Sequence, residues 1–233
     1  MTSRLQRGVI ACAAVMLLGA PTAFAAALGP TPYLQFSDSP FSGGTFSYFF
    51  LETFEDHLFN VPGVSASAGG VTSVVFGPSI HDSVDADDGV IDGSGLNGDD
   101  FFSDGATGIS FTFASVTLGG LPTHAGIVWT DGSGTTTFQA FDADNNLLGT
   151  IGPVAIANSS FNGETDDDRF FGFVNAGGIS RIFISNTQGG IEVDHLQYGR
   201  VSAVPLPAPV ALLSVGLATL GLTRRRLGKS GVR

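Results

Sequence analysis

The stretch Ile109-Ser110-Phe111-Thr112-Phe113 decides the fold class, because apolar and polar residues alternate in it without a break. Successive side chains of a β-strand point to opposite faces, so this pattern predicts a strand with one buried and one solvated face. Further strand candidates lie on both sides of it along the chain. They cover residues 45–54, 71–76, 125–130, 135–143, 147–151, 169–174, 180–185 and 191–198.

The composition between residues 26 and 203 favours strands over helices. This segment holds 27 glycines and 19 phenylalanines, which is typical of many short strands separated by turns, and it shows no helical period. We therefore expect an all-β protein with a jelly-roll-like β-sandwich. An outer-membrane barrel is the alternative, but its strands need about ten alternating residues to cross a bilayer, and most of these runs are half as long.

The N-terminus has the three parts of a secretory signal. Arg4 and Arg7 precede an apolar stretch at 8–20, and Ala23-Phe24-Ala25 places small residues where a signal peptidase cleaves. We expect a signal peptide at 1–25 and an exported domain at 26–203. Since Cys12 is the only cysteine, the exported domain has no disulfide, and a packed core must stabilise it.

Charge is distributed unevenly along the chain. All 21 acidic residues lie between Asp38 and Asp194, and the only strong bases of the exported domain are Arg169, Arg181 and Arg200, which gives that domain a net charge of −18. Such a surface repels phosphates, so we expect no nucleic-acid partner. It suits a soluble exterior or a divalent cation.

The C-terminal segment 204–228 combines a proline-rich start, an uncharged apolar stretch and a basic end. Residues 204–223 carry no charge and as a helix would cover about 30 Å, the thickness of a bilayer core. The arginines that follow would stay on the cytoplasmic side, so we expect a single transmembrane helix. The residues of this signal are Val204, Pro205, Leu206, Pro207, Ala208, Arg224, Arg225 and Arg226.

This tail resembles the PEP-CTERM class of sorting signals, and more narrowly its VPLPA-CTERM variant. The resemblance implies recognition by an exosortase, a membrane enzyme of exopolysaccharide-producing Gram-negative bacteria. It also implies processing of the tail and delivery to the cell envelope or the extracellular matrix. Segments 54–56, 83–89, 126–132, 141–144 and 192–196 resemble a domain common in such exported proteins, which has no assigned biochemical activity.

The segment 81–105 is the strongest candidate for a metal site, because it holds eight aspartates and no arginine or lysine. A bound Ca²⁺ would relieve their mutual repulsion, and Asp85, Asp87, Asp88 and Asp92 are the candidate ligands. The spacing is not that of an EF-hand, since Gly89 comes one position early and the final glutamate is missing. The alternative is a solvated acidic loop with Asp-Gly turns.

A second oxygen-rich stretch, Asp142-Ala143-Asp144-Asn145-Asn146, begins a calcium-loop pattern, but Leu147 stands where the glycine should be. Two predicted strands flank it. A hairpin turn through Asn145 and Asn146 therefore explains it with fewer assumptions.

The sequence shows no nucleophile or metal-ligand pattern of a known kind, and the catalytic alternative that stays open is a carboxylate pair as in glycosidases, whose spacing is spatial rather than sequential. His57, His81, His124 and His195 lack metal-ligand spacing, and no serine lies in a Gly-x-Ser-x-Gly motif. Asp194 and His195 are adjacent in a predicted strand, so we expect their side chains to face opposite sides and not to act together. We expect no enzyme.

The predicted function is that of a noncatalytic surface or extracellular-matrix protein with a structural or adhesive role. Its partners during export are signal peptidase and exosortase, with exopolysaccharide as a partner outside the cell. This function requires no cofactor. The alternative is a calcium-dependent carbohydrate-binding module.

Overall fold

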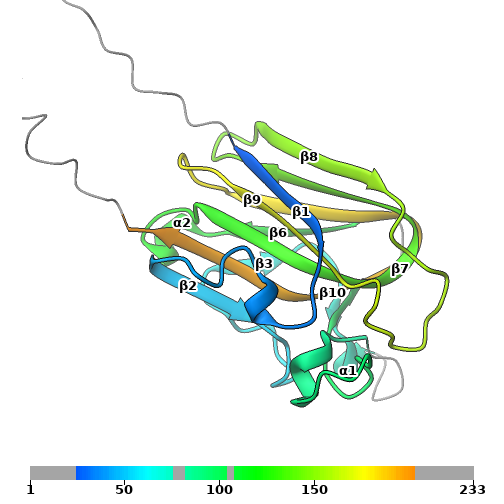
Figure 1. Ribbon diagram of the computed structural model, residues 1–233. Helices are drawn as coiled ribbons and strands as arrows, with labels where there is room; N and C mark the ends of the chain where they lie inside the picture. The colour runs from blue at the N-terminus through cyan, green and yellow to red at the C-terminus, as the bar shows by residue number, and fades with distance from the viewer. Residues whose placement is uncertain (1–24, 76–81, 104–107, 203–233) are drawn as a thin grey trace, which may run out of the picture.

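A computed structural model describes residues 25–75, 82–103 and 108–202. In this part of the chain ten strands form one open sheet, with the order β1-β9-β7-β10-β5-β4 along its main path (Figure 1). The strands are β1 (Ala26–Pro32), β2 (Phe46–Glu52), β3 (Val64–Ala66), β4 (Gly70–Val71), β5 (Phe101–Ser103), β6 (Ile109–Phe113), β7 (His124–Phe141), β8 (Leu147–Val154), β9 (Arg169–Val174) and β10 (Arg181–Val201). The helices are only three or four residues long: η1 (Phe36–Asp38), α1 (Thr72–Val75), η2 (Asp85–Asp88) and α2 (Ser115–Leu118). The all-β prediction is confirmed.

Two long antiparallel strands organise the sheet. β7 pairs with β10 along most of its length, and its other edge carries β9 along the first half and β8 along the second. β10 in turn pairs on its other edge with β6, β5 and β2 in succession. Several register shifts interrupt the β7–β10 pair, and two of them lie beside the acidic residues described below.

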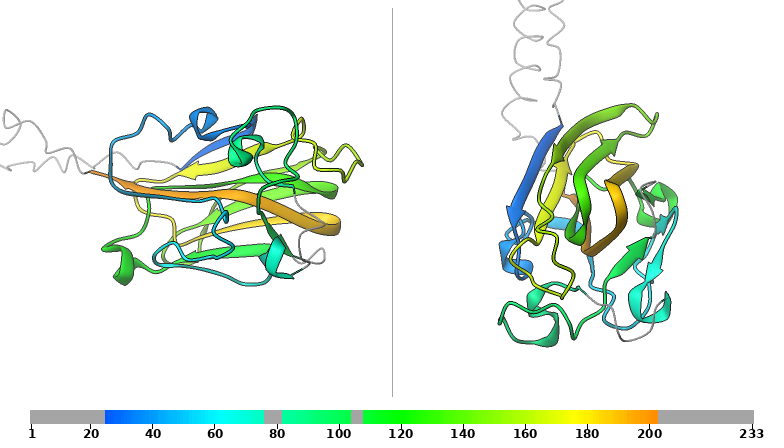
Figure 2. Two further views of the ribbon diagram at one scale, coloured as in Figure 1. Left: turned by 90° about the horizontal axis from the view of Figure 1, so that it is seen from below. Right: turned by 90° about the vertical axis from the view of Figure 1, so that its right-hand side faces the viewer.

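The two ends of the described chain lie in one row of residues that pair directly from strand to strand across the sheet. Ala26 pairs with Val174, Val174 with His124, and His124 with Gly199. The start of β1 and the end of β10 therefore lie at the same end of the molecule, and the views in Figure 2 agree.

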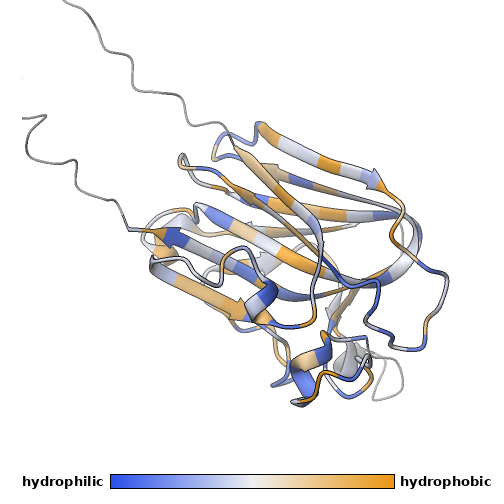
Figure 3. Ribbon diagram, viewed as in Figure 1, coloured by the Kyte–Doolittle hydropathy of each residue, from blue (hydrophilic) through white to orange (hydrophobic). Residues whose placement is uncertain are grey.

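The largest side chains of the core are aromatic. Trp129, Phe111, Phe138 and Phe171 are fully buried. Figure 3 shows apolar and polar residues alternating along several strands. This alternation directs one side of each strand to the core.

Most predicted strands are present, but their boundaries differ. The strands at 109–113 and 169–174 match β6 and β9. The candidates 125–130 and 135–143 are parts of the single strand β7, and 180–185 and 191–198 are parts of β10. The sequence interpretation missed β1, in which Gly29-Pro30 resembles a turn.

The strand predicted at 71–76 is wrong. β4 ends at Val71, and α1 begins at Thr72. β5, the partner of β4, is only three residues long, so β4 has no neighbour along which to extend. The Thr72 amide and hydroxyl both donate to the carbonyl oxygen of Asp100, which closes the ladder at this point.

Residues 1–24 of the predicted signal peptide and the whole sorting signal at 204–228 lie outside the described residues. Within the described ranges, no helix has the length and apolar character needed to span a bilayer.

Candidate functional site: a buried acidic cluster

Three acidic side chains from distant parts of the chain converge beside the β7–β10 pair. Asp82 precedes η2, Asp131 lies in β7 and Glu192 lies in β10, and one ligand atom of each lies within 4.8 Å of the others. Asp131 and Glu192 are direct partners across the two strands, and the register shifts immediately after Glu192. Such a bulge changes the direction of the side chains around it.

Two further carboxylates extend this trio to an acidic cluster of five: Asp82, Asp100, Asp131, Asp168 and Glu192. Asp100 and Asp168 are fully buried. Both carboxylate oxygens of Asp168 and one of Asp82 are buried without a hydrogen-bond partner. The neighbouring Arg169 donates to the main-chain oxygens of Asp166 (3.0 Å) and Asp168 (2.8 Å).

The electrostatics of the acidic cluster are those of carboxylates packed together in a poorly solvated place. Burial, followed by the charge of Glu192, raises the pKa of Asp82 to about 10. Burial also raises the pKa values of Asp131 and Glu192 to about 7. For Asp100 and Asp168 the pKa is well above its usual range, with burial as the main cause and Glu192 and Asp82, respectively, as the next. A cluster of this kind must either take up protons or hold a cation.

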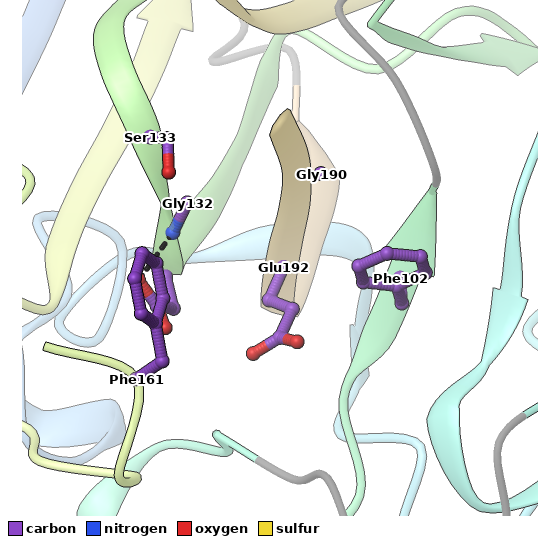
Figure 4. Close-up of a pocket in the computed structure, with 7 residues that line it drawn as sticks. Phe102, Gly132, Ser133, Phe161, Gly190 and Glu192 are labelled. Carbon is purple, nitrogen blue, oxygen red and sulfur yellow. Dashed lines mark hydrogen bonds between the residues drawn. The ribbon is translucent and has the colours of Figure 1, made fainter. Parts of the chain in front are cut away.

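A small pocket of about 80 Å³ opens above the acidic cluster. Its lining residues are Phe102, Asp131, Gly132, Ser133, Phe161, Gly190 and Glu192. Figure 4 shows the Glu192 carboxylate between the rings of Phe161 and Phe102. Phe161 is 63% exposed. Asp131 and Glu192 belong to both the pocket and the acidic cluster, so the cluster is reached from solvent through this pocket.

A second convergent group contains Asp87, Asp194 and His195, and most of its side-chain polar atoms form hydrogen bonds, whereas Asp87 Oδ2 is buried without a partner. His195 Nε2 lies 2.8 Å from Asp87 Oδ1, and His195 Nδ1 lies 2.8 Å from the Tyr33 hydroxyl. Asp194 accepts from the amides of Val84 and His195. Burial and the neighbouring Asp87 raise the pKa of Asp194 well above its usual range.

The expectation that Asp194 and His195 cannot act together is wrong. His195 has a φ of 45°, and the strand register shifts between Asp194 and Gln197. This irregularity breaks the alternation of a regular strand, so both side chains reach the same partner, Asp87.

Three of the four candidate calcium ligands of the acidic loop, Asp85, Asp87 and Asp88, have other hydrogen-bond partners for their carboxylates in the described structure. Asp85 accepts from the Asp92 and Gly93 amides and from Thr165 Oγ1, and Asp88 accepts from the Val90 amide. Among the described residues, only Asp87 of the four belongs to a convergent group of potential ligands. A calcium site formed by Asp85, Asp87, Asp88 and Asp92 stays a prediction.

The stretch at 142–146 forms the connection between β7 and β8. Asp142 Oδ1 accepts from the Asp144 and Asn146 amides, and Asn145 has a φ of 61°. These contacts are those of a tight turn, so the hairpin interpretation is confirmed.

The sequence did not lead us to predict Asp131 and Glu192 as site residues. Glu192 lies in the apolar stretch Ile191-Glu192-Val193, and an acidic residue inside a buried strand is the signal that could have singled it out. Asp168 belongs to the run Asp166-Asp167-Asp168, whose sequence predicts either an exposed loop or a loop that completes a site built by other loops; Asp168 is fully buried, so the exposed-loop prediction is wrong for this residue.

No protein-family model matches this chain, and neither the curated proteins nor the solved structures contain a significant match.

Proposed function

We propose that this chain is a noncatalytic protein exported to the cell surface or extracellular matrix, where it has a structural or adhesive role. The observation that carries the proposal is the tail at 204–228, in which VPLPA, an uncharged stretch and three arginines follow in the order of an exosortase sorting signal. A signal peptide at 1–25 starts the export. The mature chain is anchored by the C-terminal helix until the tail is processed.

Two features of the described domain support this proposal. β1 begins at Ala26, directly after the expected cleavage site, and β10 ends at Val201, three residues before VPLPA. The Asp131–Glu192 pair lies about seven residues along β7 from the row that holds both ends, or about 20 Å. An anchored domain, which we propose to be a jelly-roll-like β-sandwich, would therefore carry its pocket away from the membrane.

Replacing Pro205 and Pro207 with alanine is expected to prevent processing, because it removes the motif that the exosortase recognises. The variant should accumulate in the membrane fraction at precursor size, as cell fractionation and immunoblotting would show. Pro209→Ala, just outside the motif, is the matched control and should be processed normally. Normal processing and delivery of the double variant would contradict the proposal.

A second candidate function is that of a calcium-dependent carbohydrate-binding module. The pocket favours carbohydrate binding. An exposed aromatic ring beside carboxylates is a suitable surface for stacking on a sugar, and Phe161 is such a ring. The pocket is small, so it would take one edge of a sugar within a chain that continues across the surface.

Phe161→Ala is expected to weaken retention on the cells' own exopolysaccharide several-fold, because a sugar stacked on the ring removes apolar surface from water at roughly 25 cal/mol per Å². Affinity electrophoresis in gels containing the polysaccharide measures this. Leu147→Ala in β8 is the control, since Leu147 is also an exposed apolar residue, but lies outside the pocket. Equal retention of the two variants would exclude the pocket as the binding site.

A further inference from the structure

We infer that the acidic cluster is a calcium site, with Asp82, Asp131 and Glu192 as converging ligands, Asp168 as a further ligand and Asp100 beside them. This site is distinct from the loop site predicted at residues 85–92. The inference does not rest on the proposed export, because it concerns the folded domain alone.

The geometry of the trio matches the size of a calcium ion. Calcium binds oxygen at about 2.3–2.6 Å, so two ligands on opposite sides of the ion lie about 4.6–5.2 Å apart. The ligand atoms of Asp82, Asp131 and Glu192 all lie within 4.8 Å of one another. One ion can therefore contact all three without a rearrangement of the strands.

Unpartnered buried oxygens provide an independent indication of a missing ligand. Asp168 is 0% exposed, and both of its carboxylate oxygens are buried with no hydrogen-bond partner. Its strongest charged neighbour is Asp82, a member of the trio. Buried polar atoms in folded proteins nearly always have a partner, and a cation would supply one here.

The donor set selects calcium among the common metal ions. The trio and its two neighbours offer only carboxylate oxygens, whereas zinc sites use mainly histidine and cysteine. Magnesium keeps several water ligands and usually binds one or two carboxylates. Calcium takes six to eight oxygens, which fits several converging carboxylates.

The second group, Asp87–Asp194–His195, has hydrogen-bond partners for most of its side-chain polar atoms, and only Asp87 Oδ2 among them is buried without one. Its histidine lies between Asp87 and the Tyr33 hydroxyl, and Asp194 accepts two main-chain amides. Arg169 lies beside the acidic cluster and its charge lowers the pKa of Asp168, but its guanidinium donates to main-chain oxygens rather than to a carboxylate.

The ion would link parts of the chain that are far apart in sequence. Asp82 and Asp100 flank the loop that contains η2, Asp168 immediately precedes β9, and Asp131 and Glu192 belong to the two central strands. The pocket above Asp131 and Glu192 gives the ion a route from solvent. We therefore expect calcium to stabilise the fold of the whole domain.

The test is thermal unfolding of the full chain in mild detergent, with the fluorescence of Trp129 as the signal that reports unfolding. This residue is the only tryptophan, is fully buried and lies two positions from Asp131. Calcium at 100 times its Kd should raise the Tm by about 5–10 °C relative to chelator, from mass action on a domain of this size. Magnesium at the same concentration should give a clearly smaller shift. Equal melting curves in calcium and in chelator would overturn the inference.

Two matched variants, each of which replaces one aspartate with asparagine, locate the site. Asp168→Asn should lose most of the calcium shift, and its Tm in chelator should rise because one unpaired buried carboxylate is gone. Asp88→Asn, in the exposed part of the 85–92 loop, should keep the full shift. The opposite pattern, with the shift lost in Asp88→Asn and kept in Asp168→Asn, would overturn the inference in favour of the loop.

Terbium luminescence covers the case in which Asp168→Asn fails to fold. Terbium replaces calcium at oxygen sites and emits when a nearby tryptophan is excited. We expect emission sensitised by Trp129 from the wild-type chain, and its loss when calcium is added. Absence of sensitised emission would place any bound ion away from the acidic cluster. A failure of these tests leaves the sorting prediction untouched, because the proline variants are judged by processing alone.

Discussion

Phe138→Ala is expected to lower the free energy of unfolding by about 3–5 kcal/mol, the usual cost of removing a large aromatic side chain from a core. Phe138 is fully buried in β7. Its ring lies 5.8 Å from that of Phe171 and 5.9 Å from that of Phe173, measured between centroids. Alanine would leave a cavity between β7 and β9 that these neighbours fill only partly.

Chemical denaturation followed by Trp129 fluorescence measures this loss. Phe161→Ala is the matched control, because the same substitution is made at a ring that is 63% exposed. The control should stay within about 0.5 kcal/mol of the wild type, as surface substitutions usually do. If the two variants lost similar stability, the aromatic cluster would not be the core of the domain.

His195→Asn is the second large effect, with an expected loss of about 3 kcal/mol, because it removes two buried hydrogen bonds and leaves their partners unsatisfied. The imidazole lies between the Tyr33 hydroxyl and Asp87. Without it, Asp87 Oδ1 loses its hydrogen-bond partner while Asp87 stays next to Asp194. Asparagine tolerates the positive φ of this position, so the loss reports the side chain rather than the backbone.

The matched control is His57→Asn, since His57 also has a positive φ, of 63°, but its side chain is 69% exposed. Its loss should be clearly smaller than that of His195→Asn, because the His57 imidazole is largely in water even though its partner Asp99 is buried. Adding Asp87→Asn to His195→Asn should restore part of the stability, because it removes the unpaired charge. Urea unfolding of the three variants decides this: no recovery in the double variant would show that the charge of Asp87 is not the cause.

Local patterns predicted the strands whose neighbours are regular. The alternation at 109–113 and the apolar stretch at 169–174 correspond to β6 and β9. The same reasoning failed at 71–76, where the apolar residues suit a strand but the partner β5 ends after three residues. The existence of a strand depends on its partner as well as on its own residues.

The acidic residues show the same difference between what a local pattern predicts and what strand pairing decides. The sequence density of aspartates drew attention to Asp85, Asp87, Asp88 and Asp92, yet Asp85 and Asp88 accept hydrogen bonds that shape their own loop. Asp131 and Glu192 are isolated in sequence and meet because β7 and β10 pair in one register. A period-2 pattern cannot reveal that register.

The sequence by itself determined the all-β class, because side-chain alternation is a local property of the chain. It also contains the complete pattern on which the export and sorting prediction rests, since such signals are recognised as linear segments. Only the tertiary structure decided which carboxylates converge. That choice depends on strand register and on the bulges after Glu192 and Asp194, which arise when distant strands pair and the core between them is packed.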